Sequence, residues 1–207
     1  MTSAEDLAAL YPPPQPRALA KESATITPLY AELIAAAPFC VLATLGTSGI
    51  DCTPRGDAPG FVQVADARTL LVPDRRGNNR LDTLKNLLQC NVIGMIFMIP
   101  GVGEAVRVRG TAAISTDPDL LGRVEVADVL PVTVLVVTVD RIYFQCQRAI
   151  RRSKLWDPES RVDRKSLPSA GRLQVEAGAM TAEAAVDYDA TLDDYAAATL
   201  YAGPSKP

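Results

Sequence analysis

The stretch Thr69-Leu-Leu-Val-Pro-Asp-Arg-Arg-Gly-Asn-Asn-Arg80 joins a strand to a helix. Its first half is apolar and rich in branched side chains, as in a buried strand, and it ends at a proline. Residues 81–88 then carry leucine at helical spacing. Asn78 and Asn79 stand where N-cap residues are expected, so we predict that they cap this helix.

Three arginines surround this predicted helix start. The first turn of a helix has free backbone N–H groups and the positive end of the helix dipole, and both favour an anion. Arg75, Arg76 and Arg80 could add bidentate contacts to a phosphate. The alternative is an ordinary capped helix with solvated arginines, and this stretch alone leaves both interpretations open.

Strand patterns continue on both sides of this stretch. Two pairs of apolar runs flank short turns at 46–49 and 66–68, which indicates two hairpins. Short antiparallel strands of this kind commonly close into a barrel, which removes exposed edges. We therefore expect a mainly β fold with peripheral helices and six to seven mostly antiparallel strands, at 39–45, 50–54, 61–65, 69–73, 92–99, 104–115 and 132–146.

The composition excludes several classes of protein. The 207 residues carry a net charge of −3, which argues against non-specific nucleic-acid binding. The longest apolar run, 91–102, is interrupted by glycine and proline and is too short for a membrane helix, and the N-terminus does not resemble a signal peptide. We therefore expect a soluble, cytoplasmic protein without a membrane or nucleic-acid partner.

Histidine is absent from the chain, which excludes catalytic triads and histidine-ligated metal sites. The four cysteines, at positions 40, 52, 90 and 146, form no Cys-x-x-Cys pair. We expect no metal site and four reduced cysteines in the core. A hairpin turn at Thr47-Ser48 would also place Cys40 and Cys52 out of register.

Two further segments are candidates for a site. In Asp51–Gly60, Arg55 and Asp57 could face a ligand, or they could pair with each other in a polar loop. Trp156, the only tryptophan, follows a polar, basic segment. It could pack on an aromatic ligand or anchor the tail to the barrel.

The chain divides by composition into three regions. Residues 1–25 are expected to form an N-terminal arm with a proline-rich extended part. Residues 26–165 form the predicted barrel domain, which begins with a helix capped by Thr27. Residues 166–207 form a predicted helical extension with Thr181 as an N-cap.

Four motifs occur in a fixed order: Pro54-Arg-Gly-Asp57, Pro73-Asp-Arg-x-Gly-Asn-x-Arg80, Glu104-x-x-Arg-Val-x-Gly110 and Leu155-Trp-Asp-Pro158. Together they resemble the pyridoxamine 5′-phosphate oxidase-like FMN-binding split-barrel family, and within it a branch of FMN-dependent enzymes. The resemblance spans about residues 27–165.

The resemblance implies a homodimer with FMN at the interface between its chains. Basic residues on the second strand and at the strand–helix junction would hold the phosphate, and the backbone at 72–74 would face the flavin ring. The late tryptophan and the arginine after it would complete the site, from the same or the partner chain. The implied cofactor-binding residues are Arg55, Gly56, Asp57, Val72, Pro73, Asp74, Asn79, Arg80, Trp156 and Arg161.

Two departures from the family affect the expected substrate. Ala105 stands where the oxidases carry a flavin-contacting glutamine, and the C-terminal Arg-x-His that binds the vitamin substrate is missing. The resemblance therefore implies an FMN-dependent oxidoreductase that is not a true pyridoxamine-phosphate oxidase. Its electron donor would be a nicotinamide or another small molecule, and no catalytic acid or base is identifiable. A deazaflavin-dependent reductase and a non-catalytic flavin-binding protein are the alternatives.

Overall fold

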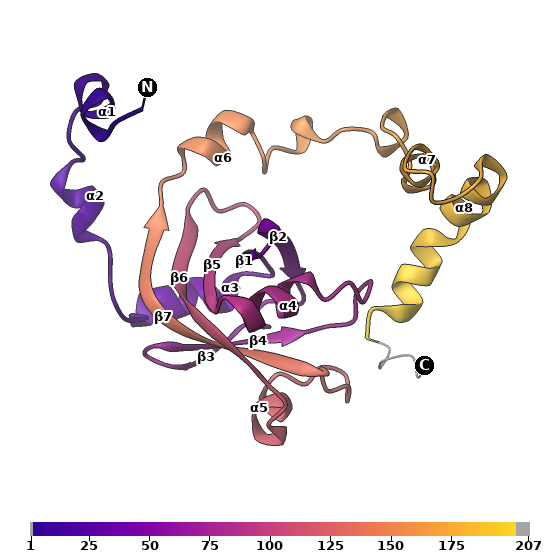
Figure 1. Ribbon diagram of the computed structural model, residues 1–207, viewed down its shortest axis with the longest axis horizontal. Coiled ribbons are helices and arrows are strands. Elements are labelled where there is room, and N and C mark those ends of the chain that lie inside the picture. The colour runs from indigo at the N-terminus through magenta and orange to yellow at the C-terminus, as the bar shows by residue number, and fades with distance from the viewer. Residues whose placement is uncertain (1, 202–207) are drawn as a thin grey trace.

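The computed structural model describes residues 2–201. Seven strands in this range form one antiparallel sheet in the order β2-β1-β5-β6-β7-β4-β3, and the sheet curls into a split β-barrel (Figure 1). This confirms the predicted fold class. The strands are β1 (Phe39–Gly46), β2 (Gly49–Gly56), β3 (Gln63–Asp66), β4 (Thr69–Asp74), β5 (Val92–Met98), β6 (Ala105–Ser115) and β7 (Thr133–Gln145).

Helices surround the barrel and form most of the tail (Figure 1). Thr27, Asp117 and Thr181 each accept a hydrogen bond from a backbone N–H of the helix that follows, as N-caps do. The helices are α1 (Ala4–Leu10), α2 (Pro16–Ala20), α3 (Pro28–Ala36), α4 (Asp82–Gln89), α5 (Pro118–Arg123), α6 (Arg148–Ser153), α7 (Ala170–Glu176) and α8 (Ala182–Thr199). No helix within residues 2–201 combines the length and apolar character that a membrane span requires.

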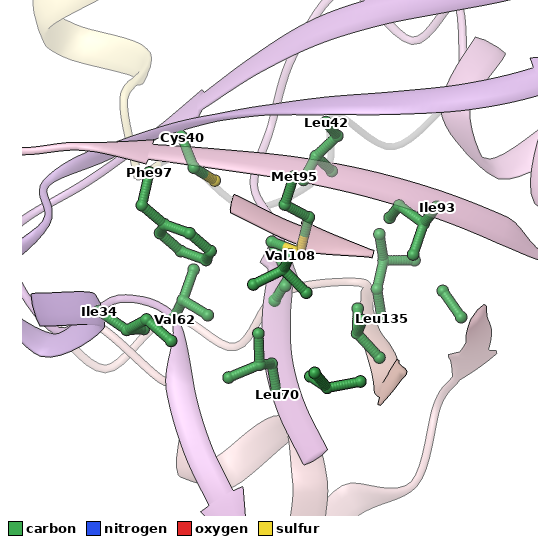
Figure 2. Close-up of a cluster of buried hydrophobic side chains, with 14 of the residues drawn as sticks. Ile34, Cys40, Leu42, Val62, Leu70, Ile93, Met95, Phe97, Val108 and Leu135 are labelled. Atoms are coloured by element: carbon green, nitrogen blue, oxygen red, sulfur yellow. The ribbon is translucent and has the colours of Figure 1, made fainter. Parts of the chain in front are cut away.

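The barrel interior is a continuous apolar core (Figure 2). Alternate residues of β1, β5 and β6 point inward, as the two-residue period of a strand requires, and α3 closes one side with Ile34. Phe97 and Leu70 lie within the same cluster. Val72 is also fully buried in this core. A single interior of this kind fixes the inward and outward faces of every strand.

The β1–β2 hairpin has the register expected from its turn. Gly46 lies opposite Gly49, Cys40 lies opposite Arg55, and Cys52 lies opposite Ala43. The two cysteines are therefore out of register, and all four cysteines of the described chain are unpaired. Burial raises the pKa of the Cys40 thiol to about 12.

The expectation that all four cysteines lie in the core is wrong. Cys52 is exposed because it lies on the edge strand β2, whose even-numbered residues face outward. Cys146 is exposed because it follows the last residue of β7. Exposure of a thiol here reflects strand position rather than residue type.

The longest strand pair, β6 with β7, contains a bulge at Arg109 and Gly110. A Cβ atom at Gly110 would lie 1.9 Å from the carbonyl oxygen of Thr138, far inside van der Waals contact. Only glycine lets the two backbones approach this closely.

Helix α4 is attached to the β1–β2 hairpin through a buried amide. The Nδ2 atom of Asn86 donates to the Asp51 carboxylate at 2.7 Å and to the Thr44 hydroxyl at 3.2 Å. Thr83 adds a hydroxyl–hydroxyl contact to Thr53 at 3.3 Å. These contacts fix the position of the helix relative to the end of β4.

The predicted capping of α4 by Asn78 and Asn79 is wrong. The N-cap is Leu81, in a left-handed conformation with φ 60°, and its side chain makes no capping bond. Asn78 instead accepts a hydrogen bond from the Arg80 N–H, and Asn79 has φ 58°. The connection therefore turns twice through left-handed residues before the helix begins at Asp82.

The tail after β7 passes over the barrel through α6 and α7, and α8 returns toward it (Figure 1). The last turn of α8 ends beside the connection between β4 and α4, and the phenol of Tyr201 lies 2.6 Å from the Asp57 carboxylate. The arm before α3 is attached by backbone pairing of Ser23 with Ile142 on β7.

Candidate functional site

A pocket of about 780 Å³ lies where the ends of β2 and β4 meet. Its lining comes from residues 52–56, 73–84 and 129–133, together with Phe61, Leu200 and Tyr201. The pocket therefore combines the edge strand β2, the β4–α4 connection, the loop before β7 and the end of the C-terminal helix.

Strand register brings these segments together. Asp74, the last residue of β4, pairs with Thr133, the first residue of β7. Arg55, near the end of β2, reaches across to Asp74, with Nη2 3.5 Å from Oδ1. One antiparallel pairing and one ion pair thus place three strand ends around one opening.

The polar side of the pocket carries four arginines against two aspartates, although the whole chain has a net charge of −3. Arg80 donates from Nε to Asp82 at 2.7 Å, but it is largely exposed. Burial raises the pKa of Asp74, and the charge of Arg55 partly offsets this rise. The local excess of arginine favours an anionic ligand.

Two arginines of the site each form an ion pair with an aspartate of another segment. Arg55 pairs with Asp74, and Arg75 pairs with Asp57 through Nε and Oδ2 at 2.9 Å. The alternative that Arg55 pairs with Asp57 is therefore wrong. β2 ends at Gly56, so Asp57 lies beyond the strand and does not share a strand face with Arg55. Each of the two residues instead pairs with a residue at or just after the end of β4.

Two buried side-chain polar atoms in the described part of the chain have no hydrogen-bond partner, and both belong to pocket residues. They are Nη2 of Arg75 and the hydroxyl oxygen of Thr133. A buried polar group without a partner costs about 1–3 kcal/mol. Their common location indicates that this pocket is arranged for a polar ligand.

The Asp57 carboxylate joins the pocket to the C-terminal helix. Its Oδ1 accepts from the Tyr201 hydroxyl at 2.6 Å and from the Ala58 N–H at 2.7 Å, while Oδ2 accepts from Arg75. Burial alone would raise the pKa of Asp57, but these hydrogen bonds outweigh it and hold the pKa below its ordinary value. The pKa of the Tyr201 phenol is raised by the same bond and the same negative charge.

The other side of the pocket is apolar. Residues 129–132, Val-Leu-Pro-Val, form the loop before β7, and Leu130 and Val132 are exposed there. Phe61 and Leu81 add to this wall. A lining that combines apolar residues with several arginines suits a ligand with a planar apolar part and an anionic part.

The structure brings together six of the ten residues predicted for the site. The side chain of Val72 is fully buried in the core, while the prediction for this residue concerns its backbone. Asp57 lies behind Arg75 rather than on the wall. The residues that line the pocket are Arg55, Gly56, Pro73, Asp74, Asn79 and Arg80.

Trp156 and Arg161 lie away from the pocket of their own chain. The indole Nε1 of Trp156 donates to the carbonyl oxygen of Val102 at 2.7 Å, and the side chain is half-buried. Within one chain Trp156 therefore anchors the tail to the loop before β6. Arg161 is exposed after a short 3-10 helix at Pro158–Ser160.

Sequence reasoning missed Thr133, the 129–132 loop and Tyr201. Apolar residues in a loop, as in Val129-Leu-Pro-Val132, were an available signal for a ligand wall. Tyr201 gave no signal, because its contact with Asp57 spans 144 residues of sequence.

Comparison with known proteins places the barrel in context. The family described as pyridoxamine 5′-phosphate oxidase matches residues 26–146. No curated protein sequence shows a significant match to this chain.

Similar solved structures cover slightly more than half of the chain. HupZ of Group A Streptococcus is 20% identical, with a TM-score of 0.49 over 58% of this chain and 94% of that one. General stress protein 26 of Bacillus anthracis is 16% identical, with a TM-score of 0.42 over 55% and 88%. An FMN-binding protein of Syntrophomonas wolfei is 13% identical, with a TM-score of 0.42 over 55% and 86%.

Proposed function

Because the chain belongs to the pyridoxamine 5′-phosphate oxidase family, we propose that its pocket binds FMN and that the protein is an FMN-dependent oxidoreductase. The observation that carries this proposal is the pair of unpartnered polar atoms, Arg75 Nη2 and Thr133 Oγ1, beside one arginine-rich pocket. A phosphate-bearing ligand would satisfy both the missing acceptor and the excess positive charge.

The residues present fit FMN in both parts of the molecule. Arg55 and Arg80 lie on the polar side, where they can hold a phosphate, and Asn79 with its left-handed backbone shapes the turn between them. The apolar loop at 129–132 offers a surface for the ring system. Bound FMN would supply hydride and electron transfer, which no side chain of the chain supplies.

The chain's own residues would bind and orient the cofactor and keep water from one side of it. Asp74, with its raised pKa, forms an ion pair with Arg55 in the pocket. No acid or base is assigned. The lack of histidine and the alanine at 105 support a substrate other than pyridoxamine 5′-phosphate.

We propose a homodimer in the cytoplasm as the working form. Trp156 and Arg161, which lie outside the pocket of their own chain, are available to complete the pocket of a second copy. Four unpaired cysteines suit a reducing compartment. Light scattering of the flavin-loaded protein tests the dimer, and a monomer with tightly bound FMN would contradict it.

The decisive experiment identifies the bound molecule and its contacts. Mass spectrometry and the visible spectrum of the purified protein should show FMN, with two visible bands, and not a deazaflavin with one near-violet band. Reduction by a nicotinamide donor in stopped flow should then separate an oxidoreductase from a pure flavin-binding protein.

Substitution of the arginines tests whether the phosphate of FMN lies against Arg55 and Arg80. Arg55→Ala should weaken FMN at least tenfold and riboflavin little, since riboflavin lacks the phosphate. Arg80→Ala should act in the same direction. Arg17→Ala, on the exposed helix α2, is the matched control and should change neither ligand. Equal losses of FMN and riboflavin in Arg55→Ala and Arg80→Ala would refute the phosphate assignment.

A further inference from the structure

We propose that Tyr201, two residues after the end of the C-terminal helix α8, is a positioning residue that keeps one nitrogen of Arg75 available to an anion in the pocket. The inference rests on the proposed function, because it concerns the phosphate-binding side of the same pocket. It gives the C-terminal segment a part in ligand binding.

The argument begins with how Arg75 meets Asp57. An arginine and a carboxylate commonly pair through two parallel hydrogen bonds. Here only Nε of Arg75 bonds to the carboxylate, at Oδ2, and Nη2 is left buried without a partner. The ion pair is therefore incomplete on the arginine side.

The second carboxylate oxygen is already engaged. Oδ1 of Asp57 accepts from the Tyr201 hydroxyl and from the Ala58 N–H. These two donors hold Oδ1 away from Nη2. Tyr201 thus prevents the closed, two-bond pair in which Nη2 of Arg75 would also bind the carboxylate.

The location of these groups supports the same conclusion. The Asp57 side chain is 2% exposed and Arg75 is 16% exposed, so water competes little for their bonds. Leu200 and Tyr201 also line the pocket directly. The lowered pKa of Asp57 keeps the carboxylate ionised at neutral pH, and the raised pKa of Tyr201 keeps its phenol protonated.

Loss of the hydroxyl alone should release Oδ1. In Tyr201→Phe the carboxylate can rotate and close on Nη2 of Arg75, so the phosphate of a ligand loses one donor. The ring that lines the pocket remains. We therefore expect FMN affinity to fall about tenfold and riboflavin affinity to change less than twofold.

The matched control is Tyr195→Phe. Tyr195 lies on α8, shortly before Tyr201, is exposed, and is not part of the pocket lining. Its variant should bind FMN and riboflavin as the native protein does. Both affinities are measured by titration of flavin fluorescence with the full-length, flavin-stripped protein.

A ligand-free measurement tests the contact itself. In Tyr201→Phe and in Asp57→Asn, amide hydrogen exchange in the last turn of α8 should become faster than in native protein and in Tyr195→Phe. An exchange rate unchanged in both variants would show that the Tyr201–Asp57 bond does not hold the helix, and would overturn the proposal.

The outcomes separate the two proposals. If native protein binds FMN but Tyr201→Phe loses FMN and riboflavin equally, or loses neither, the role of Tyr201 is wrong while the proposed function stands. If native protein does not bind FMN, the proposed function fails. Inorganic phosphate then serves as the probe, and only a severalfold loss of phosphate affinity in Tyr201→Phe retains the inference, whereas equal affinity overturns it.

Discussion

Asn86→Ala tests how the wall of the pocket is attached to the barrel. The amide of Asn86 is buried and makes the two hydrogen bonds that hold α4 against the β1–β2 hairpin. The helix begins inside the pocket lining, at residues 81–84. A change at this single side chain should therefore affect both stability and ligand binding.

The expected loss of unfolding free energy in Asn86→Ala follows from the two hydrogen bonds of the amide. The bond to the Asp51 carboxylate, at 2.7 Å, involves a charged acceptor and contributes about 2 kcal/mol. The bond to the buried Thr44 hydroxyl, at 3.2 Å, contributes about 1 kcal/mol. Asn86→Ala should thus lower the free energy of unfolding by about 3 kcal/mol in total.

Urea unfolding followed by circular dichroism measures this loss, provided that the m-value stays unchanged. Leu88→Ala, which shortens an 80% exposed side chain on the same helix, is the control and should stay within about 0.5 kcal/mol of native protein. A loss below about 1 kcal/mol in Asn86→Ala would refute the view that this amide anchors the helix.

Three further predictions concern the barrel, the carboxylate and the tryptophan. Gly110→Ala should cost about 3 kcal/mol or more because its Cβ would meet the Thr138 carbonyl, while Gly77→Ala, in open space, should be nearly neutral; similar unfolding midpoints would contradict this. Burial raises the pKa of Asp57, but hydrogen bonds from Tyr201, Ala58 and Arg75 outweigh it and lower the pKa. The stabilisation from this carboxylate is therefore complete above its pKa in the unfolded chain and is lost as pH falls through its pKa in the folded protein. Native protein should therefore lose its stability advantage over Asp57→Asn below about pH 4. A difference in unfolding free energy that stays constant with pH would show that ionisation of Asp57 does not stabilise the fold. Finally, FMN should quench the emission of Trp156 if a second copy brings it to the flavin, and emission indifferent to FMN would leave it as the anchor on Val102.

The strands were predictable because their pattern is local. Alternation along β6 and the turn between β1 and β2 determine which side chains point inward, and the observed register of Gly46 with Gly49 follows from that turn. The start of α4 was not predictable from the capping rule. Asn78 accepts a hydrogen bond from the Arg80 N–H instead, and Leu81 takes the N-cap position in a left-handed conformation that its residue type disfavours.

Only the site residues that lie within continuous sequence segments were predictable. Arg55, Asp74 and Arg80 lie in two continuous segments whose composition already indicated an anion. The partners of the charged groups depend on distances between segments, so Arg75 rather than Arg55 pairs with Asp57. Tyr201 could not be predicted because its position depends on the path of the whole tail.

The left-handed leucine at the start of α4 sets a limit on engineering for thermostability. Leu81 adopts φ 60°, a conformation that costs a non-glycine residue about 1 kcal/mol or more, yet its half-exposed side chain forms part of the apolar pocket wall. Glycine at this position would relieve the strain and raise the melting temperature, but it would remove that wall. A screen for heat resistance alone would thus select against ligand binding at this residue.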